Sequence, residues 1–290
     1  MPVGPSPRKT ILITGASSGI GAAVALELAR KGHNLALTAR RADRLERLAA
    51  GLAAMGAETL VLPDTLDDPE APERLIAAVV DRFGRLDVLI NVAGYGIPAL
   101  FGDADPAEIR RQIEVNFTAP VLLARRALPY LLESRGTVIN VGSAITHVPN
   151  PIFGVYGTTK AALAWWNDAL RREVLRRGVS VCLVEPGPIH TEFFDALQAR
   201  VPGASGRILD KPPAILHARL DDAARRIARL VDHPRRRLAV LRRVVWPFRL
   251  IGVLFRLWPA LGDIAIAPMT DHMPPLAEPA AEGLGHARSS

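Results

Sequence analysis

Short apolar runs and longer segments of helical periodicity alternate along this chain. Seven runs have the length and apolar content of buried strands, at residues 10–14, 35–39, 60–63, 88–92, 136–141, 179–184 and 237–241. The helical segments between them are 19–31, 44–55, 69–83, 107–132, 156–177 and 221–231. Pro120 and Pro129 are expected to kink or break the fourth of these helices. Such alternation is typical of a parallel sheet with helices on both faces, so we predict an α/β fold with one doubly wound sheet of about seven strands.

The segments outside this core differ from it in composition. With 290 residues, 49% of them hydrophobic and 22% charged, the chain can form one large domain, which we place at residues 10–243. Residues 1–9 form a polar tail without the apolar run of a secretory signal. An apolar and basic extension follows at 244–273, and the small, polar residues 274–290 are expected to be disordered. The single cysteine, Cys182, excludes an intramolecular disulfide and suits a reducing cytoplasm.

A glycine-rich loop, TGASSGIG at residues 14–21, joins the first strand to the first helix. Glycines let the backbone turn tightly and approach a pyrophosphate, and the helix N-terminus offers free N–H groups to the phosphates. A tight turn without ligand is the alternative, but a strand before the loop and a helix after it are the context that dinucleotide binding requires. The predicted cofactor contacts of this loop are Gly15, Ser17, Ser18, Gly19 and Ile20.

Two arginines, Arg40 and Arg41, follow the second strand, where an NAD site would carry an acidic residue. A guanidinium gives bidentate, charge-assisted hydrogen bonds to a 2′-phosphate, whereas a carboxylate would repel it. The pattern predicts NADP(H), with Arg40 as the principal ligand and Arg41 as the second. The alternative is that both arginines are solvated at the start of the next helix.

The glycine spacing G-x-x-x-G-x-G resembles the TGxxxGIG loop of the short-chain dehydrogenase/reductase family, and the resemblance extends from Ile11 to about Leu241. It implies the Rossmann-type fold of the compact single-domain members of that family. After the third strand, Asp64 and Thr65 match the family position beside the adenine, although Asp64 could equally cap a helix. The NVAG segment at residues 91–94 resembles the NNAG motif of the family and implies cofactor contacts from Asn91, Ala93 and Gly94. Its one departure, valine at position 92, puts hydrogen bonding within the sheet in question rather than cofactor binding.

Tyr156 and Lys160 stand four residues apart at the start of a long helix, so both can address one ligand. A free tyrosine has a pKa of about 10. A neighbouring ammonium stabilises the phenolate and is expected to lower that pKa. Ser143 follows the fifth strand, and its hydroxyl can hold a substrate oxygen and stabilise developing negative charge. The resemblance adds Asn116, which in the family anchors a water in a proton relay through the lysine, so the four residues match the family's catalytic tetrad.

The segment PGPIHT, at residues 186–191, resembles the PG motif of the family, whose backbone and threonine hold the nicotinamide carboxamide. The resemblance implies further cofactor contacts from Pro186, Gly187, Ile189 and Thr191, in addition to Tyr156 and Lys160. His147, His190 and Cys182 are not needed for the chemistry and are expected in the pocket wall, a loop and the core, respectively. No metal is required, and the sequence offers no convincing metal cluster.

Substrate contacts in the family come from the segment after the PG motif and from two loops closer to the N-terminus. The candidate wall residues are mainly apolar: Tyr95, Ile97, Ile145, Val148, Phe153, Phe193, Phe194 and Leu197. Such a lining predicts a hydrophobic ketone, aldehyde or secondary alcohol.

Positive charge is concentrated near the C-terminus. The net charge is +7, and residues 199–256 alone carry 14 Lys and Arg against four Asp. This suits an anionic surface, or it is a solvated arginine-rich face. Residues 244–258 are apolar, with two tryptophans, and fit a membrane interface, a cover over the pocket or a subunit contact. Pro247 and Gly252 are expected to interrupt a long helix there, and no apolar stretch reaches the roughly 20 residues of a membrane span.

Together these features predict an NADP(H)-dependent oxidoreductase that interconverts a carbonyl and an alcohol on an apolar small molecule. In this reading Tyr156 is the acid/base, Lys160 lowers its pKa, and Ser143 and Asn116 hold the substrate oxygen and the relay water, respectively. A non-catalytic dinucleotide-binding or scaffold protein on the same fold is the alternative, but it would not need Tyr156. We expect a cytoplasmic homo-oligomer, a dimer or tetramer, with or without peripheral membrane contact through residues 244–258, and no nucleic-acid partner.

Overall fold

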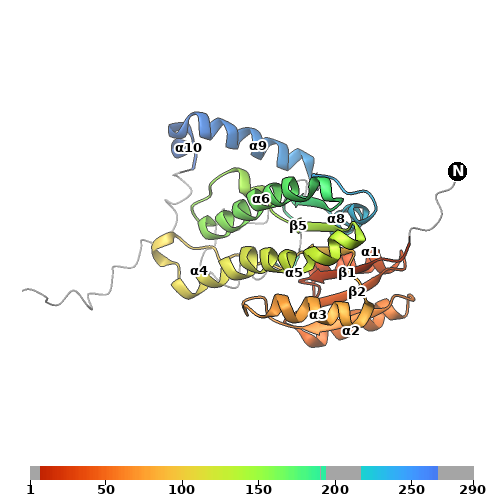
Figure 1. The fold of residues 1–290 in the computed structure, drawn as a ribbon. Helices are drawn as coiled ribbons and strands as arrows, with labels where there is room; N and C mark the ends of the chain where they lie inside the picture. Colours follow the sequence, from red (N-terminus) through yellow and green to blue (C-terminus); the bar gives the residue numbers. More distant parts are fainter. Residues whose placement is uncertain (1–6, 190, 194–216, 267–290) are drawn as a thin grey trace, which may run out of the picture.

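Seven parallel strands form one sheet in the computed structural model, which describes residues 7–189, 191–193 and 217–266 (Figure 1). The strands are β1 (Thr10–Thr14), β2 (Asn34–Ala39), β3 (Thr59–Pro63), β4 (Val88–Asn91), β5 (Thr137–Val141), β6 (Ser180–Glu185) and β7 (Arg237–Ala239). Their order is β3-β2-β1-β4-β5-β6-β7, which confirms the predicted doubly wound sheet. The order reverses between β1 and β4, so a ligand crevice is expected above the carboxyl ends of these two strands.

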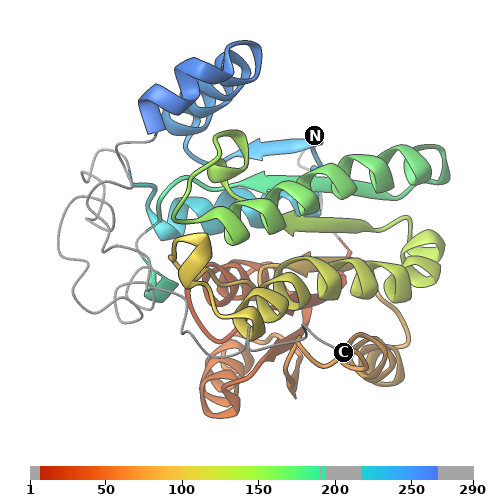
Figure 2. The same cartoon turned by 90° about the vertical axis from the view of Figure 1, so that its left-hand side faces the viewer.

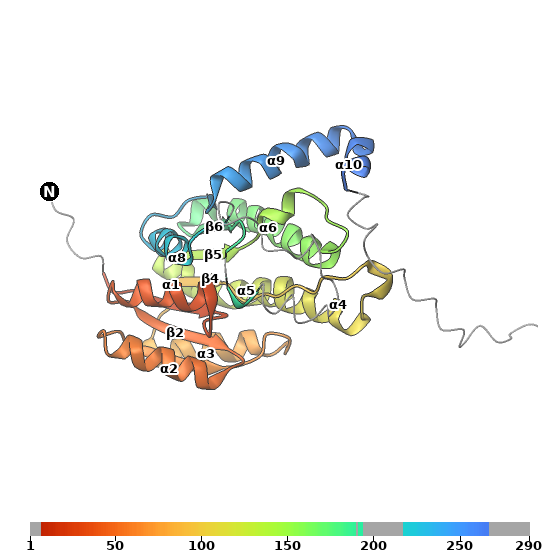
Figure 3. The same cartoon turned by 180° about the vertical axis from the view of Figure 1, so that it is seen from behind.

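Helices cover both faces of the sheet. On one face lie α1 (Gly19–Ala29), α2 (Ala42–Ala53) and α8 (Leu220–Ala228), seen in front in Figure 3. On the other lie α3 (Ala71–Phe83), α5 (Ala119–Ser134) and α6 (Gly154–Val174). Alternate strand residues serve the two cores: Ile11 and Ile13 pack under the first set of helices, and Leu12 packs under the second. The near-continuous apolar strands of the sequence therefore face helices on both sides.

The predicted helix at residues 107–132 is divided in a way that the prolines did not indicate. It consists of α4 (Pro106–Ile113), a π-helical turn η2 (Glu114–Thr118), and α5. Pro120 lies in the first turn of α5, directly after this π-helical turn, and Pro129 lies inside α5 without ending it. The irregular turn thus falls on the segment around Asn116, as π-turns often do at functional sites.

The other predicted elements are present, with ends shifted by a few residues. Short 3-10 turns complete the fold: η1 (Phe101–Asp103), η3 (Ala144–His147), η4 (Leu175–Arg177) and η6 (Arg229–Val231).

Two further helices, α9 (Arg242–Leu257) and α10 (Pro259–Ile266), lie beyond the edge strand β7 (Figure 2). The expectation that Pro247 and Gly252 interrupt a long helix is wrong, because α9 runs through both positions. In the first turn of α9, the side chains of Val244 and Val245 are buried. Further along, Gly252 packs so closely on η3 that a Cβ there would lie 2.0 Å from the carbonyl oxygen of His147. The glycine is a contact point rather than a helix end. Among the described helices, none has both the length and the apolarity to cross a bilayer.

Candidate active site

The glycine-rich loop lies directly against the segment that follows β4. Gly15 and Gly19 adopt positive φ angles of 67° and 53°, which favour glycine. A Cβ on Gly15 would lie 2.9 Å from the backbone N and Cα of Ala93. The Thr14 hydroxyl oxygen accepts hydrogen bonds from the amides of Val92 and Ala93, each at 3.1 Å. The two predicted cofactor segments therefore form one backbone surface at the N-terminus of α1.

Arg41, rather than Arg40, is the arginine that reaches this loop. Its Nη2 donates to the hydroxyls of Ser17 at 3.2 Å and Ser18 at 2.7 Å, whereas Arg40 is exposed. Its Nη1 pairs with Glu192 at 2.9 Å. Hydrogen bonds from Arg41 and from Arg44 lower the pKa of Glu192, so this carboxylate stays charged beside the loop. A cluster of two guanidinium groups and one competing carboxylate thus stands where the sequence predicts a phosphate.

Asp64 and Thr65 lie in the loop between β3 and α3. The Asp64 carboxylate accepts from the amide of Thr65 at 2.8 Å and pairs with Arg74 of α3 at 3.0 Å. It does not form the N-cap of α3, because Glu70 occupies that position.

The side chain of Asn91 belongs to the interior of the sheet. Its Nδ2 donates to Oδ1 of Asn140 at 2.8 Å, and the Asn140 amide donates in turn to Asn167 of α6 at 3.0 Å. All three asparagines are buried. This chain of amides fastens α6, which also carries Tyr156 and Lys160, to β4 and β5.

Asn116 and Lys160 meet at Gly94. A Cβ on Gly94 would lie 3.0 Å from both the Asn116 Oδ1 and the Lys160 Nζ. The Asn116 amide donates to the Tyr95 carbonyl at 2.8 Å and to Thr159 at 3.1 Å, while its Oδ1 accepts from the Tyr95 amide at 3.0 Å. Lys160 donates to the carbonyl of Val141, at the end of β5, at 3.0 Å.

The Ser143 hydroxyl interacts with Tyr156 and favours its phenolate, which lowers the pKa of the tyrosine in part. The Ser143 Oγ also accepts from the amide of Ile145 at 3.3 Å and so caps η3. Gly96 lies under the tyrosine ring, since a Cβ there would be 3.1 Å from its Cγ. The structure therefore brings all four tetrad residues to the carboxyl ends of β4 and β5.

Burial sets the protonation of this group. It raises the pKa of Tyr156 to about 12, and the interaction with Ser143 only partly opposes this. Burial likewise lowers the pKa of Lys160 to about 8. The expected lowering of the tyrosine pKa by Lys160 is not found in this structure: desolvation raises that pKa, and the lysine Nζ donates to the Val141 carbonyl instead.

Aromatic side chains surround the tyrosine. The ring centroids of Phe153 and Phe193 lie 6.3 Å and 5.7 Å from that of Tyr156. The Tyr95 hydroxyl donates to the Glu108 carboxylate at 3.0 Å, so this predicted wall residue is paired with a charged side chain. Val148 is buried and Ile97 and Ile145 are partly buried.

The PG segment lies between the loop and the last helices. A Cβ on Gly187 would lie 3.3 Å from the Cβ of Leu241, just before α9, and Ile189 is buried. Thr191 stands beside the glycine-rich loop, 3.4 Å from where a Cβ on Gly19 would be. His190, Phe194 and Leu197 lie outside the described residues.

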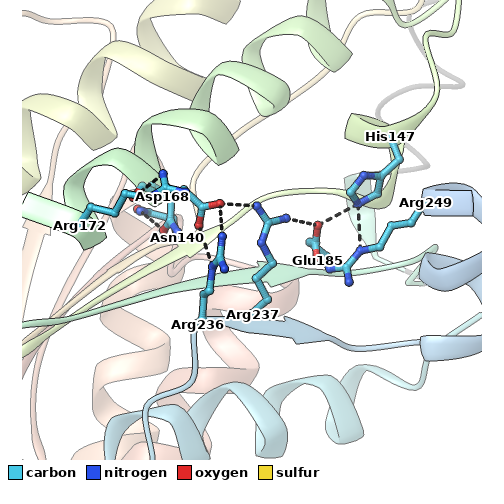
Figure 4. Close-up of polar contacts among 9 residues, drawn as sticks. Asn140, His147, Asp168, Arg172, Glu185, Arg236, Arg237 and Arg249 are labelled. Atoms are coloured by element: carbon cyan, nitrogen blue, oxygen red, sulfur yellow. Dashed lines mark hydrogen bonds and ion pairs between the residues drawn. The ribbon is translucent and has the colours of Figure 1, made fainter. Parts of the chain in front are cut away.

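A cluster of ion pairs next to this site was not predicted (Figure 4). Glu185, at the end of β6, is fully buried and pairs with His147 at 2.9 Å, with Arg237 at 3.2 Å and with Arg249. Burial would raise the pKa of Glu185, but the hydrogen bond from His147 and the charges of Arg249 and Arg237 outweigh it and lower that pKa. Arg237 continues to Asp168 of α6 at 2.8 Å. His147 was expected in the pocket wall, and instead it belongs to this cluster.

The only sequence signal for the cluster was an acidic residue at the end of an otherwise apolar strand. Cys182, in contrast, is buried in the core as expected, and burial raises its pKa to about 11. Within the described ranges, no group of three His, Cys, Asp or Glu residues is placed to hold a metal ion.

Comparisons with known proteins agree with this geometry. The sequence model of the short chain dehydrogenase family matches residues 9–201. An 11-beta-hydroxysteroid dehydrogenase-like protein of Arabidopsis thaliana is 37% identical over 64% of this chain and 60% of its own length. Serine 3-dehydrogenase of Agrobacterium fabrum is 36% identical over 63% of this chain and 73% of its own length. The chain thus spans about 60% of the length of the Arabidopsis relative.

Solved structures show the same arrangement. A short-chain dehydrogenase of Sphingobium yanoikuyae in complex with NADPH superposes with a TM-score of 0.72 at 28% identity, covering 97% of this chain and 100% of the other. A short chain dehydrogenase of Burkholderia cenocepacia in complex with NADP has a TM-score of 0.67 at 31% identity, covering 77% of this chain and 90% of the other.

Proposed function

The chain belongs to the short-chain dehydrogenase family, and we propose that it is an NADP(H)-dependent oxidoreductase that interconverts an apolar ketone or aldehyde and the corresponding alcohol. The observation that carries the proposal is the convergence of the tetrad. Gly94 lies against both Asn116 and Lys160, Gly96 lies against the Tyr156 ring, and Ser143 acts on the pKa of Tyr156. A binding-only protein has no need for a buried tyrosine in that position.

The residues present fit a dinucleotide phosphate. Gly15 lets the loop pack directly on Ala93, and the free amides at the start of α1 are groups that bind a pyrophosphate. Arg41 and Arg44 offer two guanidinium groups to a 2′-phosphate. The NADPH and NADP found in the two structural relatives support this choice of cofactor.

The proposed chemistry divides among four side chains. Bound NADPH supplies the hydride. Tyr156 donates a proton to the substrate oxygen, and its pKa of about 12 keeps it protonated at neutral pH. Ser143 holds the same oxygen and stabilises its developing charge. Lys160, with a pKa of about 8, is mainly an ammonium at pH 7 and can pass a proton toward Tyr156, with Asn116 holding the relay water.

The aromatic surroundings of Tyr156 support an apolar substrate. Phe153 and Phe193 flank the hydroxyl-bearing ring. Apolar walls with few polar groups suit a ketone or aldehyde on a hydrophobic body. The name of the Arabidopsis relative, 11-beta-hydroxysteroid dehydrogenase-like, agrees with this class.

Nicotinamide absorbance at 340 nm tests the proposal. Wild-type protein is mixed with NADPH and a panel of apolar ketones and aldehydes, with matched hydrophilic carbonyls as controls. We expect NADPH oxidation with apolar members of the panel. Tight NADPH binding without turnover of any carbonyl would instead support the non-catalytic alternative.

We further propose that α9 contacts an anionic membrane surface. Trp246, Leu250, Val253 and Leu257 follow one another at helical spacing and are 47%, 66%, 53% and 65% exposed. Their helix contains no acidic residue, and its other exposed side chains include Arg242, Arg243 and Arg256. Apolar and cationic groups on one surface fit a lipid interface with anionic headgroups.

Vesicle co-sedimentation distinguishes this role from a subunit contact. The double variant Leu250→Glu/Leu257→Glu should abolish the binding to phosphatidylserine vesicles that wild type shows at low salt, while the oligomeric mass stays unchanged. Wild-type protein that stays in the supernatant at low salt would refute the membrane contact. A variant that loses its oligomeric mass would assign the surface to the homo-oligomer, whose size, a dimer or tetramer, remains a proposal.

A further inference from the structure

The segment from Ser143 to His147, which includes η3, packs against α9. Ser143 directly precedes η3, and His147 ends it. A Cβ on Gly252 of α9 would lie 2.0 Å from the carbonyl oxygen of His147, so helix and turn touch through their backbones. One turn of helix earlier, Arg249 lies beside the His147 ring, with Nε 3.4 Å from Nε2, and both side chains bond the carboxylate of Glu185. The last helix before α10 thus contacts the catalytic segment at two neighbouring points.

Glu185 connects these contacts into one cluster. Its carboxylate is fully buried and bonds His147 with one oxygen and Arg249 with the other (Figure 4). Arg237 bonds the first oxygen from the edge strand β7. A buried carboxylate that lost these partners would be strongly destabilised, so the cluster holds its members in one arrangement.

The backbone on both sides of Ser143 is also bonded to β6 and the residues that follow it, since the amide of Gly142 donates to the Val184 carbonyl at 2.8 Å. The amide of Ala144 donates to the Pro186 carbonyl at 3.1 Å, and the Thr146 hydroxyl donates to the Ser143 carbonyl at 2.9 Å. The second of these bonds lies within the segment itself. These bonds fix the backbone of Ser143, whereas its Oγ accepts from the amide of Ile145 within η3 at 3.3 Å, so the direction of the hydroxyl depends on what fixes η3 at its far end, His147.

We propose that Arg249, acting through His147 and Glu185, is a positioning residue that sets the place of Ser143 at the reacting oxygen. Residues of the C-terminal helix would then govern the rate of the reaction without touching substrate or cofactor. A displacement of about 1 Å at such a group can cost about 100-fold in rate. This inference rests on the proposed function for its kinetic part only. The contact of Arg249 and Gly252 with His147, called the link below, can be measured without substrate.

Two variants act on the link in different ways. Arg249→Met removes the guanidinium and keeps an apolar stem of similar length. Gly252→Ala changes no charge, and it would raise helix propensity, but its methyl group has no space against His147. Arg229→Met and Gly51→Ala are the matched controls: Arg229 is an exposed arginine in η6, outside α9, and a Cβ on Gly51 of α2 meets nothing within 4 Å.

Hydrogen–deuterium exchange of full-length protein measures the link, and steady-state kinetics measures its consequence. We expect amides at 144–148 to exchange at least about tenfold faster in both test variants, while the controls stay within about twofold of wild type. With an apolar carbonyl that wild type reduces, kcat should fall about 10- to 100-fold in the test variants. The Kd for NADPH should stay within about twofold, because the phosphate loop and Arg41 lie elsewhere.

The outcomes separate the two proposals. Unchanged exchange in a folded Arg249→Met protein would overturn the link, and faster exchange with normal kcat would overturn its role in positioning Ser143. Wild type that reduces no carbonyl would refute the proposed function, while the exchange result would still test the link. Arg249→Lys, which keeps the charge without the planar fork, replaces Arg249→Met if the latter does not fold, and it should show an intermediate kcat.

Discussion

The two sides of the site are held together by different kinds of contact. Around β1 and β4 the contacts are short and made largely by backbone: Gly15 lies against Ala93, and Thr14 accepts from two successive amides. Around β5, β6 and α9 they are made by long charged side chains, which converge on the buried carboxylate of Glu185. Both sides join residues far apart in the sequence, 78 and 79 positions on the first side and 64 and 102 on the second, but only the residues of the first side belong to short sequence motifs.

The largest expected effect lies on the second side. Tyr156→Phe keeps the ring and removes only the hydroxyl, so turnover of an apolar carbonyl should fall at least about 100-fold. NADPH affinity, which depends on the first side, should change little. Steady-state rates together with NADPH titration check both parts. Near-normal turnover in the variant would remove Tyr156 from the role of proton donor.

A smaller effect is expected on the first side. Arg41→Ala should weaken NADPH binding by about 1.5–3 kcal/mol, or about 10- to 150-fold, because a charge-assisted bond to phosphate is lost. NADH affinity should hardly change. Arg40→Ala is the matched control, since Arg40 is exposed and Arg41 bonds Ser17 and Ser18. If fluorescence titration shows the larger loss of NADPH affinity for Arg40→Ala, Arg40 is the principal phosphate ligand, as the sequence predicted, and the assignment to Arg41 is wrong.

The difference between Arg40 and Arg41 shows which features of the site a sequence pattern cannot predict. The strands and the places of Ser143, Tyr156 and Lys160 could be predicted, because these residues follow directly on a strand or open a helix, whereas Asn116, inside the π-helical turn η2, was indicated only by the family resemblance. Which of two adjacent arginines turns toward the loop depends on rotamers and on Glu192, more than 140 residues away. No local pattern contains that information.

The same limit explains the errors at the C-terminus and at the tyrosine. Pro247 and Gly252 suggested a broken helix, yet packing of Val245 and the close contact with His147 keep α9 continuous. The pKa of Tyr156 was expected to fall beside Lys160, but burial, a property of the whole fold, raises it. Propensity and spacing describe neighbours along the chain, and both of these features depend on tertiary packing.

The pH dependence of the reduction rate shows which of the two proton-exchanging groups, Tyr156 or Lys160, limits the reaction. Tyr156, with a pKa of about 12, stays protonated across the accessible range, so it should not limit the rate of reduction. Lys160 loses its charge as pH rises through about 8, so kcat/KM should be level below that pH and fall about tenfold per unit above it. Initial rates from pH 6 to 10 check this. A level profile up to pH 10 would show that the Lys160 charge is not needed.

The smallest expected effect concerns the carboxylate that competes for Arg41. Glu192 pairs with both Arg41 and Arg44, and an incoming 2′-phosphate must displace it. Glu192→Gln should therefore raise NADPH affinity about two- to fivefold, the range for exposed ion pairs, and leave NADH affinity unchanged. Because these pairs are exposed, the gain should shrink at high salt. An equal gain for both cofactors would place Glu192 away from the phosphate.

Transfer of label from cofactor to product tests the central claim most directly. Wild-type protein is given NADPH that carries deuterium at both C4 positions, together with an apolar ketone, and the product alcohol is analysed by mass spectrometry. Hydride transfer with Tyr156 as proton donor predicts one deuterium at the carbinol carbon, and almost no alcohol from the Tyr156→Phe variant in the same time. Alcohol without deuterium, or equal amounts of labelled alcohol from both proteins, would contradict the account.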